Sequence, residues 1–158
     1  MKKLFTALCF VLVASLSCLA QETYTWKKEN IKVILPAGMK VVDDDGDGKI
    51  TVASKQATLQ LMASLNQDLD DEDKAAGLLV KIANNIDLNM DDYDTDEFEC
   101  VGGTGYYIIG EHKTSEKTAI AGMAWDTAED RYMLVVALFY EDAAESVGRV
   151  LGGLNFPD

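Results

Sequence analysis

The chain has 158 residues, of which 48% are hydrophobic and 26% are charged, which is enough for one sizeable hydrophobic core in one domain. Its 27 acidic side chains outnumber its 14 lysines and arginines, and the formal net charge at pH 7 is −13. A negative field of this size repels phosphate backbones and anionic lipid and attracts cations, so the composition excludes nucleic acid as an expected partner.

Residues 1–20, MKKLFTALCFVLVASLSCLA, have the three parts of a secretory signal peptide. Two lysines open the segment, and an apolar stretch follows that is too short to span a membrane. A small-x-small cleavage site ends it at Ala20, so we expect a mature chain that begins at Gln21 and is exported to the periplasm or secreted. Lipidation of Cys18 is the second interpretation, because Leu16 stands where lipoprotein signals carry a small residue.

The expected mature domain, residues 21–158, has no stretch of membrane-spanning length. Loss of the signal removes two lysines and no acid, so the net charge moves from −13 to −15. Of the three cysteines, only Cys100 remains, and no internal disulfide is expected. The stability of the domain is therefore expected to come from packing or from a metal.

The first part of this domain alternates apolar and polar residues, which is typical of strands with one buried face. Pro36-Ala37-Gly38 predicts a turn between two of them. The predicted strands are Thr23–Lys28, Asn30–Pro36, Met39–Asp43 and Ala57–Leu65.

The period changes in DLDDEDKAAGLLVKIANNID, residues 68–87, where apolar side chains recur at helical spacing. Asp70 and Asp71 are N-cap candidates, and the acids of the first turn complement the helix dipole. The stretch that follows, NMDDYDTDEFE at 89–99, is so acidic that we expect a solvated loop there.

Three further strands are predicted at Gly105–Lys113, Thr118–Asp126 and Arg131–Tyr140, with connections short enough for hairpins. Arg131–Tyr140 is apolar on both alternating sets, which predicts an interior strand paired with Thr118–Asp126. An amphipathic helix is expected at 141–156. The element order predicts an α+β domain: an antiparallel sheet with a helix packed on each face, an α/β/α sandwich.

Two short segments resemble a known family. NIKVILPAGMKVV, residues 30–42, is similar to the opening hairpin of the PsbP-like proteins and their small secreted bacterial relatives. AAESVGRVLGGLNF, residues 143–156, is similar to their closing helix. The resemblance implies an α/β/α sandwich and an assembly or accessory role rather than an enzyme, and it assigns no site residue in this chain.

The run DDDGDGKITVAS, residues 43–54, has the spacing of a calcium loop. Such a loop takes oxygens from its first, third and fifth positions, a sharp turn at a glycine, and a backbone carbonyl at the seventh. Those ligands are here Asp43, Asp45, Asp47 and the carbonyl of Lys49, and Thr51 can add its hydroxyl or a water. Calcium is therefore the one expected cofactor.

Ser54 stands where the loop should carry a bidentate acid, which makes any calcium site here weak. A distant acid could replace it, and the acidic clusters 68–73 and 91–99 are candidates. The alternative is a metal-free hairpin turn, because aspartate and glycine are the preferred turn residues.

Catalytic chemistry has little support in the sequence. His112 is the only histidine, Cys100 is the only mature cysteine, and the two match no local signature of a nucleophile and base. Gly102–Gly105 lacks the lysine of a phosphate loop and predicts a turn or a bulge. We also expect Cys100 to be buried and unreactive.

The sequence thus predicts an exported, non-enzymatic accessory or binding module, with a weak structural calcium site at Asp43–Ser54. The alternatives are a metal-free module that binds an unidentified protein or small molecule, and a small enzyme of unrecognised type.

Overall fold

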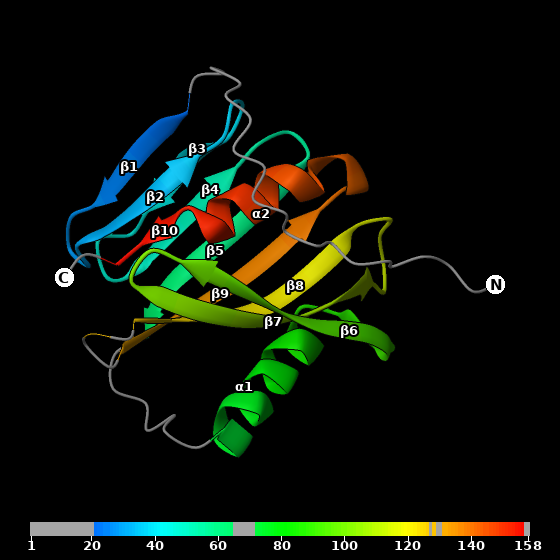
Figure 1. Cartoon of the computed structure of the whole chain (residues 1–158). Helices are drawn as coiled ribbons and strands as arrows, with labels where there is room; N and C mark the ends of the chain where they lie inside the picture. The colour runs from blue at the N-terminus through cyan, green and yellow to red at the C-terminus, as the bar shows by residue number, and fades with distance from the viewer. Residues whose placement is uncertain (1–20, 65–71, 127, 129–130, 157–158) are drawn as a thin grey trace.

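The structure is a computed structural model that describes residues 21–64, 72–126, 128 and 131–156. Its described strands form a seven-stranded sheet in the order β3-β4-β5-β9-β8-β7-β6 and a three-stranded sheet in the order β1-β2-β10, with every pair of neighbours antiparallel (Figure 1). The elements are β1 Glu22–Trp26, β2 Ile31–Leu35, β3 Lys40–Asp44, β4 Lys49–Ala53, β5 Ala57–Ser64, α1 Glu72–Asn85, β6 Leu88–Cys100, β7 Gly103–His112, β8 Thr118–Asp126, β9 Arg131–Phe139, η1 Glu141–Ala143, α2 Ala144–Gly152 and β10 Leu154–Asn155.

The interior position of β9 is confirmed. It lies between β5 and β8, and Thr118 and Phe139 are partners in the β8–β9 register. An interior strand of a sheet that is covered on both faces needs apolar side chains on both of its own faces, which is the pattern seen in the sequence. The strand at Ala57–Ser64 is also confirmed, although its residue types favour helices, because it pairs with β9 along its whole length.

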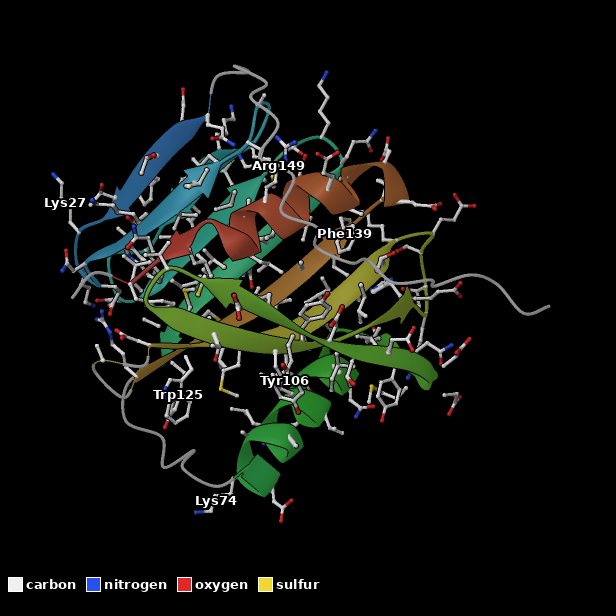
Figure 2. The ribbon with its side chains drawn as sticks, in the orientation of Figure 1. Lys27, Lys74, Tyr106, Trp125, Phe139 and Arg149 are labelled. Atoms are coloured by element: carbon white, nitrogen blue, oxygen red, sulfur yellow. The ribbon has the colours of Figure 1, made fainter. Side chains whose placement is uncertain are left out.

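Different layers cover the two faces of the large sheet. On one face, Leu79 and Ala83 of α1 pack with side chains of β7, β8 and β9. Tyr106 and Trp125 lie on this side (Figure 2). The Trp125 and Tyr132 rings pack edge to face there, with their centroids 4.8 Å apart. On the other face, α2 and the small sheet together cover the main core, which includes Phe139.

The fold class is α+β, with two helices and antiparallel sheets, as expected. The expectation of a single sheet is wrong, because β1, β2 and β10 form a sheet of their own. A plain sandwich of one sheet between two helices is therefore not the arrangement found. Alternation along a strand reports which faces are buried but not which partner the strand chooses, so the sequence could not divide the strands between sheets.

The acidic segment predicted as a loop is a strand. β6 extends from Leu88 to Cys100 and pairs with β7 from Tyr93 onward, after an irregularity in the register. Leu88 and Phe98 anchor its two ends in the core, while residues 91–97 between them are all exposed. The sequence shows no alternating apolar pattern here, because acidic residues fill the middle of the strand and only Leu88 and Phe98 near its ends are buried.

The two sheets meet at the turn between β6 and β7. Gly102 takes a φ of +78° in this turn, as expected for a glycine there. Val101 forms a parallel bridge with Asn155 of β10, and its N–H and carbonyl bond Leu154 and Phe156 at 3.0 and 2.9 Å. The predicted closing helix ends at Gly152, and the residues after it return to the small sheet. The helix N-cap candidates Asp70 and Asp71 lie outside the described residues.

We expect Gly105→Ala to destabilise the domain by about 1 to 3 kcal/mol, since overpacking carries a cost of this order. A Cβ at Gly105 would lie 2.1 Å from the Phe98 ring and 2.8 Å from the Met123 carbonyl oxygen. The matched control is Gly77→Ala in α1, where a Cβ meets no atom within 4 Å. That change should stabilise by about 0.5 to 1 kcal/mol. Urea unfolding measures both, and equal midpoints would contradict the close β6–β7 packing.

Candidate functional site

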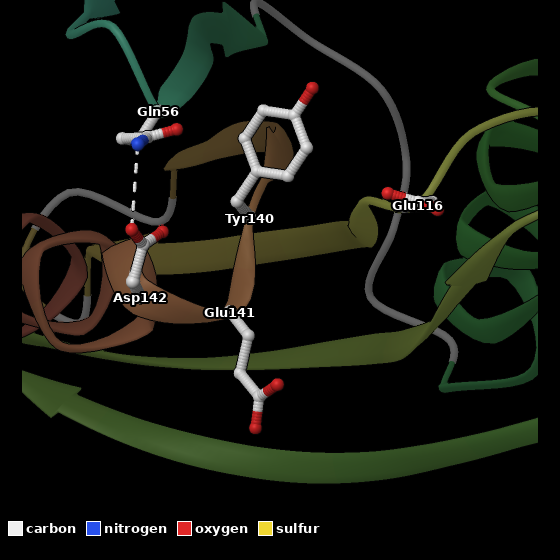
Figure 3. A pocket seen from close by; sticks show the side chains of 5 residues that line it. All are labelled: Gln56, Glu116, Tyr140, Glu141 and Asp142. Carbon is white, nitrogen blue, oxygen red and sulfur yellow. Dashed lines mark hydrogen bonds between the residues drawn. The ribbon is translucent and has the colours of Figure 1, made fainter.

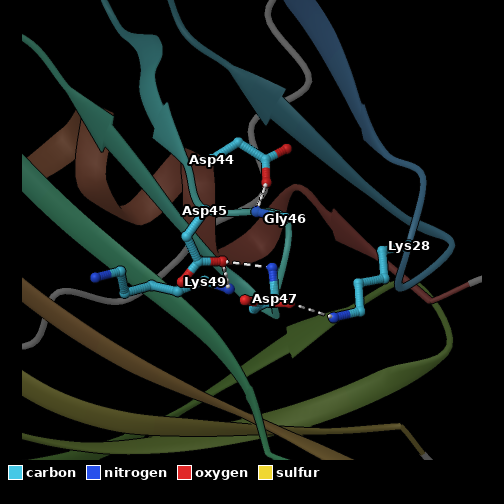
Figure 4. Close-up of polar contacts among 6 residues, drawn as sticks. All are labelled: Lys28, Asp44, Asp45, Gly46, Asp47 and Lys49. Carbon is cyan, nitrogen blue, oxygen red and sulfur yellow. Dashed lines mark hydrogen bonds and ion pairs between the residues drawn. The ribbon is translucent and has the colours of Figure 1, made fainter.

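The predicted calcium loop is a hairpin turn between β3 and β4, closed by its own hydrogen bonds (Figure 4). The Asp45 carboxylate accepts the backbone N–H of Asp47 at 2.8 Å and that of Lys49 at 3.0 Å. The Asp45 N–H donates to the Lys49 carbonyl at 3.1 Å. The bond from Asp47, and then the bond from Lys49, lower the pKa of Asp45. Gly46 and Gly48 have φ of +70° and +115°, which glycine adopts without strain.

The neighbouring side chains tie this hairpin to the small sheet. The Tyr24 hydroxyl on β1 donates to the Asp44 carboxylate at 2.5 Å, and this bond is the main cause of a raised Tyr24 pKa. The Lys28 ammonium lies 3.7 Å from the Asp47 carboxylate (Figure 4). Both partners of that ion pair are largely exposed, so it contributes little to stability.

The predicted calcium ligands occupy one short hairpin between β3 and β4. Asp43 pairs with Thr51 in the ladder, and Asp45 is engaged with Lys49 as described. Among the described residues, no three His, Cys, Asp or Glu side chains form a group that could hold a metal. Occupation of the loop by calcium stays a prediction.

Sequence reasoning missed one acid beside this hairpin. Glu29, in the turn between β1 and β2, is only 7% exposed. A Cβ built on Gly48 would lie 3.7 Å from a Glu29 carboxylate oxygen. Among the described residues, no hydrogen bond to the Glu29 side chain is formed, although its backbone carbonyl accepts one from Arg131 at 3.0 Å. No local motif marks Glu29, because its position follows from the packing of one hairpin against another.

A second candidate is an open pocket where β9 passes into η1. Its volume is about 590 Å³, and its lining is Gln56, Glu116, Tyr140, Glu141 and Asp142. Figure 3 shows the Tyr140 ring between Gln56 and Glu116, with the Gln56 amide donating to Asp142 at 3.4 Å. Tyr140 is 40% exposed, and the Lys117 ammonium lies over its ring, 5.2 Å from the centroid. Three carboxylates and an aromatic face suit a cation.

The exposed part of β6 is a third candidate. It is the last strand of the large sheet, so one edge of its backbone has no neighbouring strand among the described residues. Residues 91–97 are exposed on both faces. Lysine and arginine are absent from residues 88–100, so nothing within the strand neutralises its acids.

Cys100 and His112, weighed from the sequence as a nucleophile and base, do not meet. Cys100 faces Gly103 in the β6–β7 register, whereas His112 faces Leu88 at the far end. About nine residues of strand separate them, which corresponds to about 30 Å. The His112 ring nitrogen Nδ1 instead lies 2.8 Å from the Ser115 hydroxyl. Cys100 is half-buried rather than fully buried, and burial, with a smaller contribution from Asp126, raises the pKa of its thiol to about 11.

Comparison with known proteins places the chain by fold alone. No protein-family model matches it, and neither does any curated protein. The solution structure of PsbP (CyanoP) from the cyanobacterium Synechocystis sp. PCC 6803 matches with a TM-score of 0.56 and 14% identity, over 90% of this chain and 96% of that one.

Two structures of Mog1 match as well. The Ran-binding protein Mog1p of Saccharomyces cerevisiae has a TM-score of 0.53 and 11% identity, over 88% of this chain and 86% of that one. A point mutant of Mog1 has a TM-score of 0.52 and 11% identity, over 84% of this chain and 86% of that one. The resemblance to PsbP-like proteins is thus supported at the level of the fold. Within the described residues, no helix has the length and hydrophobicity needed to span a membrane.

We expect Cys100 in native residues 21–158 to react slowly with a thiol reagent at pH 7.5. A rise of the thiol pKa from 9.0 to about 11 lowers the thiolate fraction about 100-fold. The rate should increase with pH until the thiol ionises near pH 11, because only the thiolate reacts. The same chain unfolded in urea is the control, and equal rates in the two states would contradict the burial of this thiol.

Proposed function

We propose that this protein is an exported, non-catalytic binding or accessory module that takes a positively charged partner. The observation that carries the proposal is the pocket around Tyr140, in which the protein's own Lys117 ammonium already lies over the aromatic ring. The same site presents Glu116, Glu141 and Asp142 to solvent. An incoming lysine or arginine side chain would take the place of the Lys117 ammonium on this ring face and would meet three carboxylates, two interactions that favour a cation.

Charge and fold support the same proposal. The net charge of the mature chain, −15 after removal of two lysines from −13, accelerates encounters with basic partners and repels acidic ones. A protein of similar fold, yeast Mog1p, is a Ran-binding protein, so the scaffold is compatible with a protein partner. An enzymatic role has less support, because Cys100 and His112 lie at opposite ends of a hairpin.

The first test uses Nα-acetyl-lysine amide as the probe and backbone amide shifts as the readout. We expect binding in the millimolar range, with shifts centred on Gln56, Glu116 and Tyr140. Tyr140→Ala should weaken binding about two- to fivefold, whereas Tyr140→Phe, which keeps the ring, should not. Shifts spread evenly over all the acidic residues, or equal effects of the two variants, would contradict a site at the pocket.

A second candidate function is weak calcium binding at Asp43–Ser54. The observation that favours it is Glu29, a nine-tenths buried carboxylate with an oxygen near Gly48, in a loop that has Ser54 in place of its twelfth-position acid. Asp43, Asp45 and Asp47 would have to turn inward around the ion, with the Lys49 carbonyl and the Thr51 hydroxyl. Such a site would have the affinity of extracellular calcium modules, about 10⁻⁴ to 10⁻³ M.

The free energy of unfolding should then rise with calcium by about 1.4 kcal/mol at tenfold excess over the dissociation constant, and magnesium should have less effect. The double variant Asp45→Asn, Asp47→Asn keeps side-chain oxygens that can accept the turn N–H groups and should lose the effect, as should Glu29→Gln. The control Asp92→Asn, Asp94→Asn removes the same charge from β6 and should keep it. Equal responses of the two double variants in thermal melts would instead indicate general screening.

A further inference from the structure

The outer edge of β6 has the features of a docking site for another strand. The neighbour of β6 in the sheet is β7, and on the other side no described strand follows. A strand in this position presents alternate backbone N–H and carbonyl groups to solvent. The exposed stretch, residues 91–97, is long enough to pair with an extended segment of a partner.

Two local hydrogen bonds identify which residues face outward. The Glu97 N–H donates to the carboxylate of Asp96 at 2.9 Å, and the Asp91 N–H donates to the side chain of Asn89 at 3.2 Å. These two N–H groups therefore point to nearby side chains and not into the ladder with β7. In the regular part of the ladder, from Tyr93 to Cys100, outward groups recur every second residue, so counting back from Glu97 the N–H groups of Thr95 and Tyr93 point the same way.

The side chains determine which partner can approach this edge. Acids on both faces of the strand surround the outward groups, namely Asp91, Asp92, Asp94, Asp96, Glu97 and Glu99. Like charges directly opposite one another destabilise a strand pair, while opposite charges stabilise it. The acids therefore prevent a second copy of β6, or any acidic strand, from adding to this edge, as charged residues on sheet edges generally do. The same acids are complementary to lysine and arginine.

We propose that the outer edge of β6 accepts an extended, lysine- or arginine-rich segment of a partner protein as an eighth strand of the large sheet. This rests on the proposed function, since it gives the positively charged partner a second contact in addition to the pocket. Backbone hydrogen bonds to Tyr93, Thr95 and Glu97 supply the geometry, and alternating basic side chains of the segment lie opposite the acids of β6. Such binding combines main-chain affinity with charge selectivity.

The experiment uses the protein and a short synthetic peptide in which lysine alternates with threonine, with a glutamate–threonine peptide as the control. We expect the lysine peptide alone to bind, and its binding to weaken with salt. Amide hydrogen exchange at Tyr93 and Thr95 should slow on binding, because those N–H groups become bonded. Asp92→Asn combined with Asp94→Asn should weaken binding about fivefold.

The matched variants Thr95→Pro and Thr95→Ala separate strand addition from simple charge attraction. Proline removes one outward N–H and is tolerated at an edge where that group faces solvent, while alanine keeps it. We expect Thr95→Pro to weaken peptide binding about tenfold through the lost strand pairing, and Thr95→Ala to leave it unchanged. If Thr95→Pro does not fold, hydrogen exchange in the unsubstituted protein decides the question.

Equal binding by the two Thr95 variants, or unchanged exchange at the outward amides of the bound protein, would overturn strand addition while leaving the proposed cation binding intact. Failure of both the lysine peptide and Nα-acetyl-lysine amide to bind would instead overturn the proposed function itself. Tyr140→Ala should weaken only the binding of the amide. If that variant also lost the slowed exchange that the peptide produces, the peptide would be bound at the pocket, which would contradict a site on β6.

Discussion

The guanidinium of Arg131 joins the β8–β9 hairpin to the turn between β1 and β2. Its Nε donates to the Asp126 carboxylate at 2.8 Å, and its Nη1 donates to the Glu29 carbonyl at 3.0 Å. Asp126 is 1% exposed, so its charge requires a positive partner that replaces the lost water. The Arg131 side chain thus closes the β8–β9 hairpin. It also holds the turn between β1 and β2, which carries Glu29, beside the hairpin between β3 and β4. The position of Glu29 beside Gly48 depends on this contact.

The sequence predicted the elements that carry their own periodicity. β9 and α1 were recognised because burial on both faces, or on one helical stripe, leaves a pattern in neighbouring residues. The division into two sheets was not, since Val33 of β2 pairs with Leu154 of β10, and no local pattern encodes that choice. β6 was missed for another reason: residues 91–97 bury nothing, and the strand exists because β7 supplies hydrogen-bond partners.

The candidate sites follow the same division. The hairpin at Asp43–Ser54 was found because turn residues are adjacent in the sequence. Glu29 and the pocket were not, because Gln56, Glu116 and Tyr140 come from separate hairpins that only the folded sheet brings together. The excess of acidic residues was visible from the composition, but the structure places much of it along one unpaired strand edge and around one aromatic ring. The composition gives only the net charge, whereas the structure shows where on the surface the acidic side chains lie.

The bridge between Val101 and β10 bears on the order in which the chain can fold. β10 pairs with β2, and Leu154 and Phe156 hydrogen bond to Val101, so late residues complete contacts with segments made long before them. Contacts between residues so distant in sequence form slowly, because loop closure precedes any stabilisation they provide. During synthesis, the small sheet therefore stays incomplete until β10 has emerged from the ribosome. Until then the chain is not fully folded. This suits the export that we propose, because a secretion channel that passes extended chains requires a polypeptide that has not yet folded completely.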